Sequence, residues 1–518
     1  MSDLDTFLEQ YGLSAIDARA FIYANLSSPE IIYETAGVYN VSFSMLAELY
    51  GQGVTEEQVK QFFSQFGLDT TDSAPQSDVT ALFPDKESVL GARSITVNTV
   101  SAFSDRTTPY IETVLTREDW DGATVTYNFP NTLPDSHRES YETSFGWRPL
   151  NEIERASFVD IANRQNQYID VELVQVFDAV EADIQVVAVI QDSTTEAFAF
   201  FPAYGIGGDI FLNAEGLALN PNYYAPGGYG ISTMAHELGH AMGGDHTFEG
   251  DSVLPVEFDN TYFSIMTYTE TGFVEVEAFV SGGEYYTQET ESYRSELGII
   301  DVAALQYAYG ANMATNSGDD VYVYNENSRS FDSSNDHYLT IWDAGGVDTI
   351  DVSGASYGSL IDLNDYTLSS VSERSAYEEA LEVAAEAGLG TFDQVSFIEN
   401  VINSLGDEAF LNQNNLGIAF GVVIENVVTG AADDVIIDNE VDNLIFAGSG
   451  DDILYLGGGG YDQVDGGAGI DSVYLPQAYK DVERYFDQDG YHVLADNFAA
   501  TLVGVEYIHY SDTTVSIA

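Results

Sequence analysis

The spacing of apolar residues changes along the chain, and each spacing predicts a different element. Apolar residues recur at a helical period in 42–67 and again in 150–170. A strand is predicted at 123–129, ATVTYNF, and two more in the short apolar runs of 182–190 and 196–213. From residue 123 on, a strand comes first, and the histidine-rich segment at 233–248 falls on a later helix. This order predicts an α+β fold.

The length of the chain divides this pattern into several domains. A chain of 518 residues is too long for a single hydrophobic core. The polar stretch LDTTDSAPQSD, at 68–78, is a predicted linker between a helical N-terminal segment and the α+β part. We place the boundaries at 1–75 for the N-terminal segment, 76–312 for the central domain and 313–518 for the C-terminal domain.

Charge and composition limit which binding partners and which metal ligands the chain can have. The chain has 85 acidic and 15 basic residues, a net charge of −70, which disfavours nucleic acid and anionic membranes and favours divalent cations. Because there is no cysteine, a zinc site must use histidine and carboxylate ligands, and disulfides are excluded. No apolar run reaches about 18 residues, and the acidic N-terminus lacks a basic and an apolar region, so neither a membrane span nor a conventional signal peptide is expected.

The stretch TMAHELGHAMGGDHTF holds three of the seven histidines of the chain. His236 and His240 are four residues apart, so a helix places both rings on one face, within reach of one zinc ion. Gly243 allows a sharp turn that brings His246 round as a third ligand, and Glu237 can act on the water at the metal. Three buried, hydrogen-bonded histidines, or a zinc site that has lost catalysis, are the alternatives to a catalytic centre.

A nonapeptide repeat fills residues 429–474. It matches the G-G-x-G-x-D-x-U-x pattern of a parallel β-roll, in which the sixth residue and loop carbonyl groups bind Ca²⁺ and the eighth fills the interior. The alternative, a plain glycine-rich linker, would not repeat a polar residue at the sixth position and an aliphatic residue at the eighth position through five repeats. The predicted sixth-position calcium ligands are Asp434, Asn443, Asp452, Asp462 and Asp471, and the eighth positions hold Ile436, Ile445, Leu454, Val464 and Val473.

The zinc helix together with YFSIMTYTE, which contains Met266 and Tyr268, resembles the serralysin branch of the metzincin zinc endopeptidases. The segments 115–129, 196–213 and 299–312 are similar to its entry strand, its substrate-binding edge strand and its closing helix. The resemblance implies a methionine turn beneath the metal at Met266, and a Tyr268 hydroxyl that stabilises the tetrahedral intermediate. The central domain is thus expected to be a metzincin protease domain, followed by a calcium-binding parallel β-roll.

The same resemblance adds calcium candidates before the repeats. TNSGDDVYVYN and TIWDAGGVDTIDVSG are similar to the first turns of the serralysin roll, which implies Asp320, Asp343 and Asp348 as ligands. Glu399 and Glu425 compete for the glutamate that precedes the repeats. We prefer Glu425 because it runs directly into the first nonapeptide. Between these segments, residues 372–388 read as an inserted amphipathic helix.

The sequence therefore predicts a secreted, extracellular zinc endopeptidase with one catalytic Zn²⁺ and several structural Ca²⁺. Zinc, held by the three histidines, is expected to activate a water molecule. Glu237 is expected to accept a proton from this water and to pass it to the leaving amine. Residues 1–70 exceed the usual serralysin propeptide, and the C-terminus suits an uncleaved type I secretion signal. Expected partners are protein or peptide substrates, a proteinaceous inhibitor and the type I secretion apparatus, with the chain a monomer. The alternative is a non-catalytic, calcium-dependent adhesin or surface-layer protein with a relic zinc site.

Overall fold

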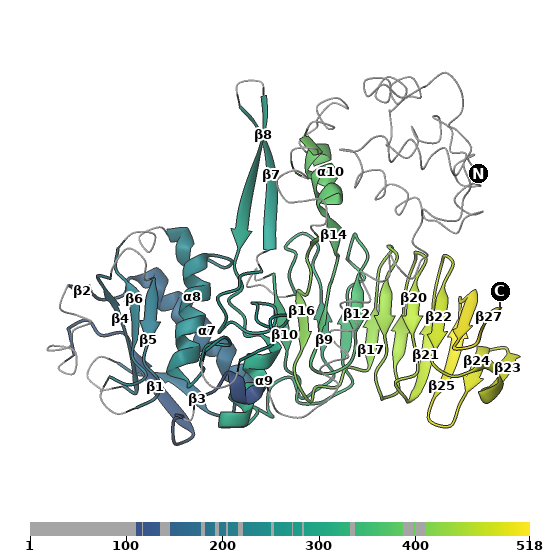
Figure 1. The fold of residues 1–518 in the computed structure, drawn as a ribbon, viewed down its shortest axis with the longest axis horizontal. Coiled ribbons are helices and arrows are strands. Elements are labelled where there is room, and N and C mark those ends of the chain that lie inside the picture. The colour runs from purple at the N-terminus through teal and green to yellow at the C-terminus, as the bar shows by residue number, and fades with distance from the viewer. Residues whose placement is uncertain are drawn as a thin grey trace. The chain divides into compact units, whose positions relative to one another are not determined.

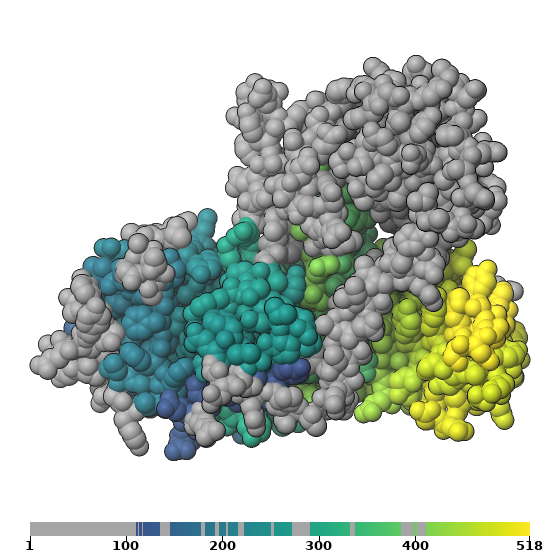
Figure 2. Space-filling view, in the orientation of Figure 1, coloured from purple at the N-terminus to yellow at the C-terminus, as the bar shows by residue number. Residues whose placement is uncertain are grey.

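The structure is a computed structural model that describes residues 110–517 with internal gaps; uncertain residues are drawn in grey in Figures 1 and 2. The gaps are 117, 135–145, 178–181, 192–195, 204–205, 216–220, 250–252, 272, 282–283, 332–336, 387–396, 399–400 and 402–409. The predicted helical N-terminal segment, the linker and Glu399 lie outside the described residues. The chain divides into two compact units, the larger of which comprises 103–275, 291–373 and 412–518.

The first part of the larger unit holds a mixed sheet with strand order β3-β1-β4-β6-β5, and β2 also pairs with β4. β1, β3, β4 and β6 run parallel, whereas β5 is antiparallel to β6 and lies at the end of the sheet. The strands are β1 (Thr124–Asn128), β2 (Trp147–Arg148), β3 (Glu172–Gln175), β4 (Ile184–Val189), β5 (Ala197–Ala199) and β6 (Ile210–Asn213). The strands predicted in 123–129, 182–190 and 196–213 are thereby confirmed.

Three helices accompany this sheet: α7 (Glu152–Tyr168), α8 (Tyr229–Ala241) and α9 (Ile299–Tyr309). α7 begins where the Asn151 side chain accepts hydrogen bonds from the backbone N–H groups of Ile153 and Glu154, a capping box that satisfies the free donors of the first turn. The predicted helix in 150–170 is confirmed. Short 3₁₀ helices lie at η1 (Ile111–Thr113), η4 (Pro221–Tyr224) and η5 (Tyr479–Asp481).

The C-terminal part is rich in strands that are mostly parallel and alternate between two sheets from β17 to β22 (Figure 1). One sheet has the order β23-β24-β25-β21-β19-β17-β11-β9, and the other has the order β12-β18-β20-β22-β26-β27. The bounds are β9 (Val321–Val323), β11 (Thr349–Asp351), β12 (Leu360–Asp362), β17 (Asn426–Val428), β18 (Val435–Ile437), β19 (Leu444–Phe446), β20 (Ile453–Tyr455), β21 (Tyr461–Asp465), β22 (Ser472–Leu475), β23 (Glu483–Asp487), β24 (Gly490–Leu494), β25 (Ala499–Val503), β26 (Tyr507–Tyr510) and β27 (Thr513–Ser516).

The eighth residues of the repeats lie between these two sheets. Each of them is 3% exposed or less, as the nonapeptide pattern predicts. They stack in register: Ile436 pairs with Leu454 and Leu454 with Val473 in one sheet, while Ile445 pairs with Val464 in the other. An aliphatic side chain at every eighth position therefore builds a continuous core from short strands.

The remaining strands form smaller sheets. β10 (Leu339–Ile341), β16 (Leu416–Ile418) and β13 (Thr367–Ser369) make a three-stranded sheet, and β7 (Phe273–Ser281) pairs with β8 (Glu284–Ser292). In the smaller unit, β14 (Arg374–Ser375) pairs with β15 (Phe410–Leu411), and α10 spans Ala376–Glu386. α10 lies within 372–388, where the inserted helix was predicted. Among the described residues, no helix is long and apolar enough to cross a membrane.

Candidate metal and catalytic site

Helix α8 carries the first two predicted zinc ligands, and a glycine beyond its end turns the chain. His236 and His240 are each 8% exposed and lie one helical turn apart. After the helix ends, Gly243 adopts φ +89°, a conformation that glycine tolerates and other residues rarely adopt. The turn returns the chain so that the Nε2 atom of His246 lies 3.3 Å from that of His236 and 3.1 Å from that of His240. The structure therefore brings the three predicted ligands together.

The ring nitrogens on the far side of two of these histidines are held by backbone carbonyl groups. His236 Nδ1 lies 2.7 Å from the carbonyl oxygen of Ile265, and His240 Nδ1 lies 2.8 Å from that of Gly244. A carbonyl oxygen only accepts, so both Nδ1 atoms carry the proton and both Nε2 lone pairs are free. Burial, and after it the neighbouring His240, lowers the pKa of His236 to about 3, and burial lowers that of His240 to about 4. Neutral imidazoles of this kind are the donors that zinc takes, so the residues fit the ion.

Glu237 lies beside this cluster and is buried. Its side chain is 5% exposed, and the Oε2 atom has no hydrogen-bond partner. Burial raises the pKa of Glu237 to about 8, although a backbone hydrogen bond from Ala199 of β5 acts in the opposite direction. A buried oxygen without a partner is costly, and such a group is typical of a site whose ligand completes it.

Met266 and Tyr268 lie where the resemblance implies. Met266 is 2% exposed beneath α8, and a Cβ atom added at Gly239 would lie only 2.4 Å from its sulfur atom, so the glycine makes room for the methionine. Tyr268 is 65% exposed, with its ring centroid 4.7 Å from that of His246. Burial, and then the Glu237 charge, raises the pKa of Tyr268, which keeps its hydroxyl protonated.

Two contributors to this site were not predicted from the sequence. Phe248 stacks on His246, with centroids 5.0 Å apart and planes at 11°, and also contacts Tyr268. The carboxylate of Asp301, on α9, accepts hydrogen bonds from Ser264 Oγ at 2.5 Å and from Ile265 N at 2.7 Å. It thereby holds the segment whose carbonyl group orients His236. A lone acid in the apolar run IIDVAAL was the available signal for Asp301.

The predicted calcium ligands of the described residues lie in the loops that precede the strands of the two large sheets, except Asp462, which is the second residue of β21. Asp320, Asp343 and Asp348 offer carboxylate oxygens that all lie within 4.8 Å of one another. Glu425 Oε2 accepts a hydrogen bond from Asp348 N at 2.8 Å, which joins it to this group. Within the described part of the chain, four aspartates each keep one buried oxygen without a hydrogen-bond partner: Asp348, Asp452, Asp462 and Asp471.

These oxygens fit a cation because they have no donor to satisfy them. Burial comes first among the causes that raise the pKa of Asp452 and of Asp462 to about 8, and a carboxylate in such surroundings needs a positive partner to stay charged. Hard oxygen donors from carboxylates and loop carbonyl groups are those that Ca²⁺ takes. Asp434 is also buried, and its Oδ1 accepts a hydrogen bond from Ser359 N at 2.6 Å. Asn443 differs from these acids, because its Nδ2 atom donates a hydrogen bond to the carbonyl oxygen of Glu425 at 3.0 Å.

Comparison with known proteins agrees with this geometry. The family described as Peptidase M10 serralysin C terminal matches residues 311–391. Serralysin C of Dickeya chrysanthemi is 32% identical over 259 residues, which cover 47% of this chain and 43% of that protein. Metallopeptidase AprA of Pseudomonas marginalis is 33% identical over 262 residues, covering 47% and 45%. The chain is related to the serralysin-type metallopeptidases.

A third serralysin, from Photorhabdus laumondii, is 30% identical over 337 residues, which cover 61% of this chain and 58% of that protein. The chain therefore spans less than two thirds of the length of these relatives. The family match at 311–391 begins just after α9, at the start of the strand-rich C-terminal part. The fold is an α+β part followed by a strand-rich C-terminal region.

Proposed function

We propose that this chain is a secreted zinc metalloendopeptidase that hydrolyses peptide bonds of extracellular proteins and is stabilised by calcium. The observation that carries the proposal is the convergence of three imidazole Nε2 atoms beside a buried glutamate with an unpaired oxygen. The Nε2 atom of His246 lies 3.3 Å from that of His236 and 3.1 Å from that of His240. A relic site is disfavoured because Glu237, which zinc binding does not require, is retained beside the ligands.

The roles of the residues follow from their positions. Zinc held by His236, His240 and His246 would act as a Lewis acid and lower the pKa of water. Glu237 accepts a proton from the attacking water and then donates it to the leaving amine, a task that suits a buried carboxylate next to the ligand His236. The Tyr268 hydroxyl donates a hydrogen bond to the developing oxyanion.

Strand β5 is the proposed substrate-binding edge. It lies at the end of its sheet, and the backbone of Ala199 contacts Glu237. A peptide added as a further strand would bind the open backbone groups of β5 and run past the catalytic glutamate. Recognition through backbone groups suits an enzyme that cleaves many protein substrates.

Calcium is assigned to the acidic loops of the C-terminal part. The support is the set of unpaired carboxylate oxygens at Asp348, Asp452, Asp462 and Asp471, in a chain without cysteine. In calcium-poor cytoplasm, repulsion between these carboxylates would keep the region unfolded and ready for type I secretion, and extracellular calcium would fold it. We further propose that the protein acts as a monomer and that a proteinaceous inhibitor can bind it.

Casein zymography of the purified chain, with and without a zinc chelator, tests the activity. Glu237→Gln is the sharpest variant, and Glu257→Gln, at an exposed position, is its control. Glu237→Gln should keep zinc in metal analysis, because the ligands are intact, yet lose several orders of magnitude in rate. Near wild-type cleavage by Glu237→Gln, or by the chelated protein, would refute the mechanism.

A further inference from the structure

The acidic loops are joined by hydrogen bonds that form two ladders, one along each large sheet. In the first ladder, a carboxylate oxygen accepts the backbone N–H of the preceding turn at every step. The bonds are Ser359 N to Asp434 Oδ1 at 2.6 Å, Asp434 N to Asp452 Oδ1 at 2.8 Å, Asp452 N to Asp471 Oδ1 at 3.0 Å, and Asp471 N to Glu506 Oε2 at 2.8 Å. Each carboxylate thus uses one oxygen as the acceptor of a ladder hydrogen bond, and its second oxygen can bind another partner.

The second ladder follows the same rule except at one step. Its regular bonds are Asp320 N to Asp348 Oδ1 at 2.8 Å, Asp348 N to Glu425 Oε2 at 2.8 Å, and Asn443 N to Asp462 Oδ1 at 3.0 Å. Between Glu425 and Asn443 the direction reverses, because Asn443 Nδ2 donates to the backbone carbonyl oxygen of Glu425 at 3.0 Å. At this step the side chain is the donor and the preceding turn is the acceptor.

A second asparagine completes the reversal. Asn439 Nδ2 donates to the carbonyl oxygens of Leu363 at 3.0 Å and of Ile424 at 2.8 Å, and Asn439 Oδ1 accepts from Asn443 Nδ2 at 3.0 Å. Both side chains are buried, at 6% and 3% exposure. Three backbone carbonyl groups that converge on one space are therefore satisfied by amide N–H donors.

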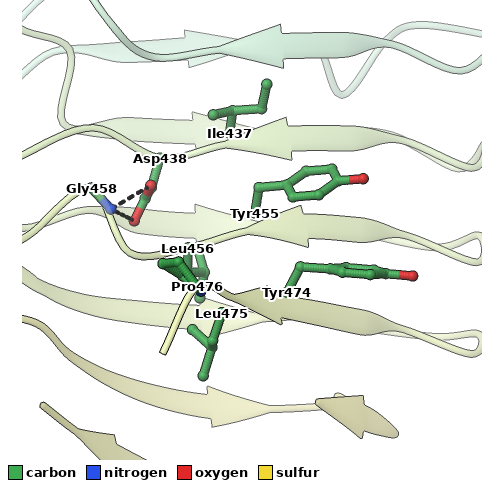
Figure 3. Close-up of a pocket in the computed structure, with 8 residues that line it drawn as sticks. All are labelled: Ile437, Asp438, Tyr455, Leu456, Gly458, Tyr474, Leu475 and Pro476. Atoms are coloured by element: carbon green, nitrogen blue, oxygen red, sulfur yellow. Dashed lines mark hydrogen bonds between the residues drawn. The ribbon is translucent and has the colours of Figure 1, made fainter. Parts of the chain in front are cut away.

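Asn439 and Asn443 belong to the repeat at 438–446, and its sequence is unusual at these two positions. The second residue of the other four repeats is glycine (Gly430, Gly448, Gly458 and Gly467), and the sixth residue is aspartate; here they are Asn439 and Asn443. The first residue, Asp438, accepts hydrogen bonds from Gly457 N at 2.7 Å and Gly458 N at 3.0 Å, the second of which is drawn in Figure 3. The loop 438–443 is thus hydrogen-bonded to both of its neighbours.

We propose that the turn held by Asn439 and Asn443 closes without a calcium ion, and that the two amide groups take the place of the cation. A cation and an N–H donor both satisfy carbonyl oxygens by bringing positive charge to them, so one space cannot hold both. Calcium does not fit here, and Asn443, which the repeat pattern predicts to be a ligand, serves as a donor. The proposal rests on the assignment of calcium to the other loops.

The test is the number of calcium ions bound per full-length chain at saturation, measured by native mass spectrometry. Asn439→Gly with Asn443→Asp restores the glycine and the acid of the other repeats and should bind one calcium more than the wild type. Asn497→Asp adds the same charge at an exposed position and should leave the number unchanged. An unchanged number in the double variant would overturn the proposal.

A second variant keeps the test decisive if the first does not fold. Asn439→Ala with Asn443→Ala removes the donors and should leave the calcium number equal to that of the wild type, whereas a loss of one ion would make Asn443 a ligand and overturn the proposal. A wild type that binds no calcium would instead refute the calcium assignment itself. The two failures are therefore distinguishable.

Discussion

Gly243→Ala tests whether the turn after α8 is required to deliver the third histidine. Alanine at φ +89° carries a strain of about 1–2 kcal/mol. Its Cβ atom would also lie 2.4 Å from the backbone oxygen of Glu118, so one of the two segments must shift. Such a shift strains the hydrogen bonds that Gly243 O accepts from Thr116 N at 2.8 Å and Thr116 Oγ1 at 3.0 Å, each of which contributes about 1 kcal/mol.

The backbone strain and the two weakened hydrogen bonds together destabilise the native turn by about 3–4 kcal/mol. The turn can relieve this strain by moving, and the movement withdraws His246 from the other two histidines. We therefore expect zinc affinity, measured by competition with a chelator, to fall by roughly 100- to 1000-fold, since 1.4 kcal/mol is a factor of ten. Gly421→Ala is the matched control, because Gly421 has φ +83° but nothing within 4 Å of the added Cβ. It carries the same strain without the clash and should bind zinc as the wild type does. Equal zinc affinity in the two variants would refute the reasoning.

Three further predictions concern the oxyanion, the acidic loops and the core. Tyr268→Phe should lower kcat by roughly ten- to a thousand-fold with little change in KM, because the hydroxyl acts mainly on the transition state; steady-state kinetics on a peptide would contradict this if only KM changed. Asp452→Ala with Asp462→Ala should raise the calcium concentration needed for the β-sheet circular dichroism signal while zinc content stays constant, and full signal in excess chelator would defeat it. Ile445→Ala should cost about 2–5 kcal/mol in urea unfolding because Ile445 is fully buried, whereas Leu444→Ala, 37% exposed, should cost far less; equal losses would place the core elsewhere.

Much of the site was determined by local sequence. The spacing of His236 and His240 places both rings on one face of a helix whatever surrounds it, because the α-helix has a fixed period. Gly243 permits the turn to His246 for an equally local reason. In the C-terminal part, an aliphatic residue at every eighth position has to face inward, and the five side chains at these positions are buried.

Other features were decided by contacts between segments far apart in the chain. The Nδ1 partner of His236 is the carbonyl oxygen of Ile265, 29 residues away, and the backbone N–H of Ile265 donates to Asp301 on another helix. The pKa of Glu237 depends on burial, which spacing alone does not reveal.

The reversal at Asn443 is the clearest case. The repeat pattern marks it as a ligand position, but an amide can accept or donate, and only its neighbours determine which. In the folded chain the carbonyl oxygen of Glu425 lies against its nitrogen, so the amide donates. The sequence determined where the ladder positions fall, and the tertiary structure decided which of them have an oxygen left for a cation.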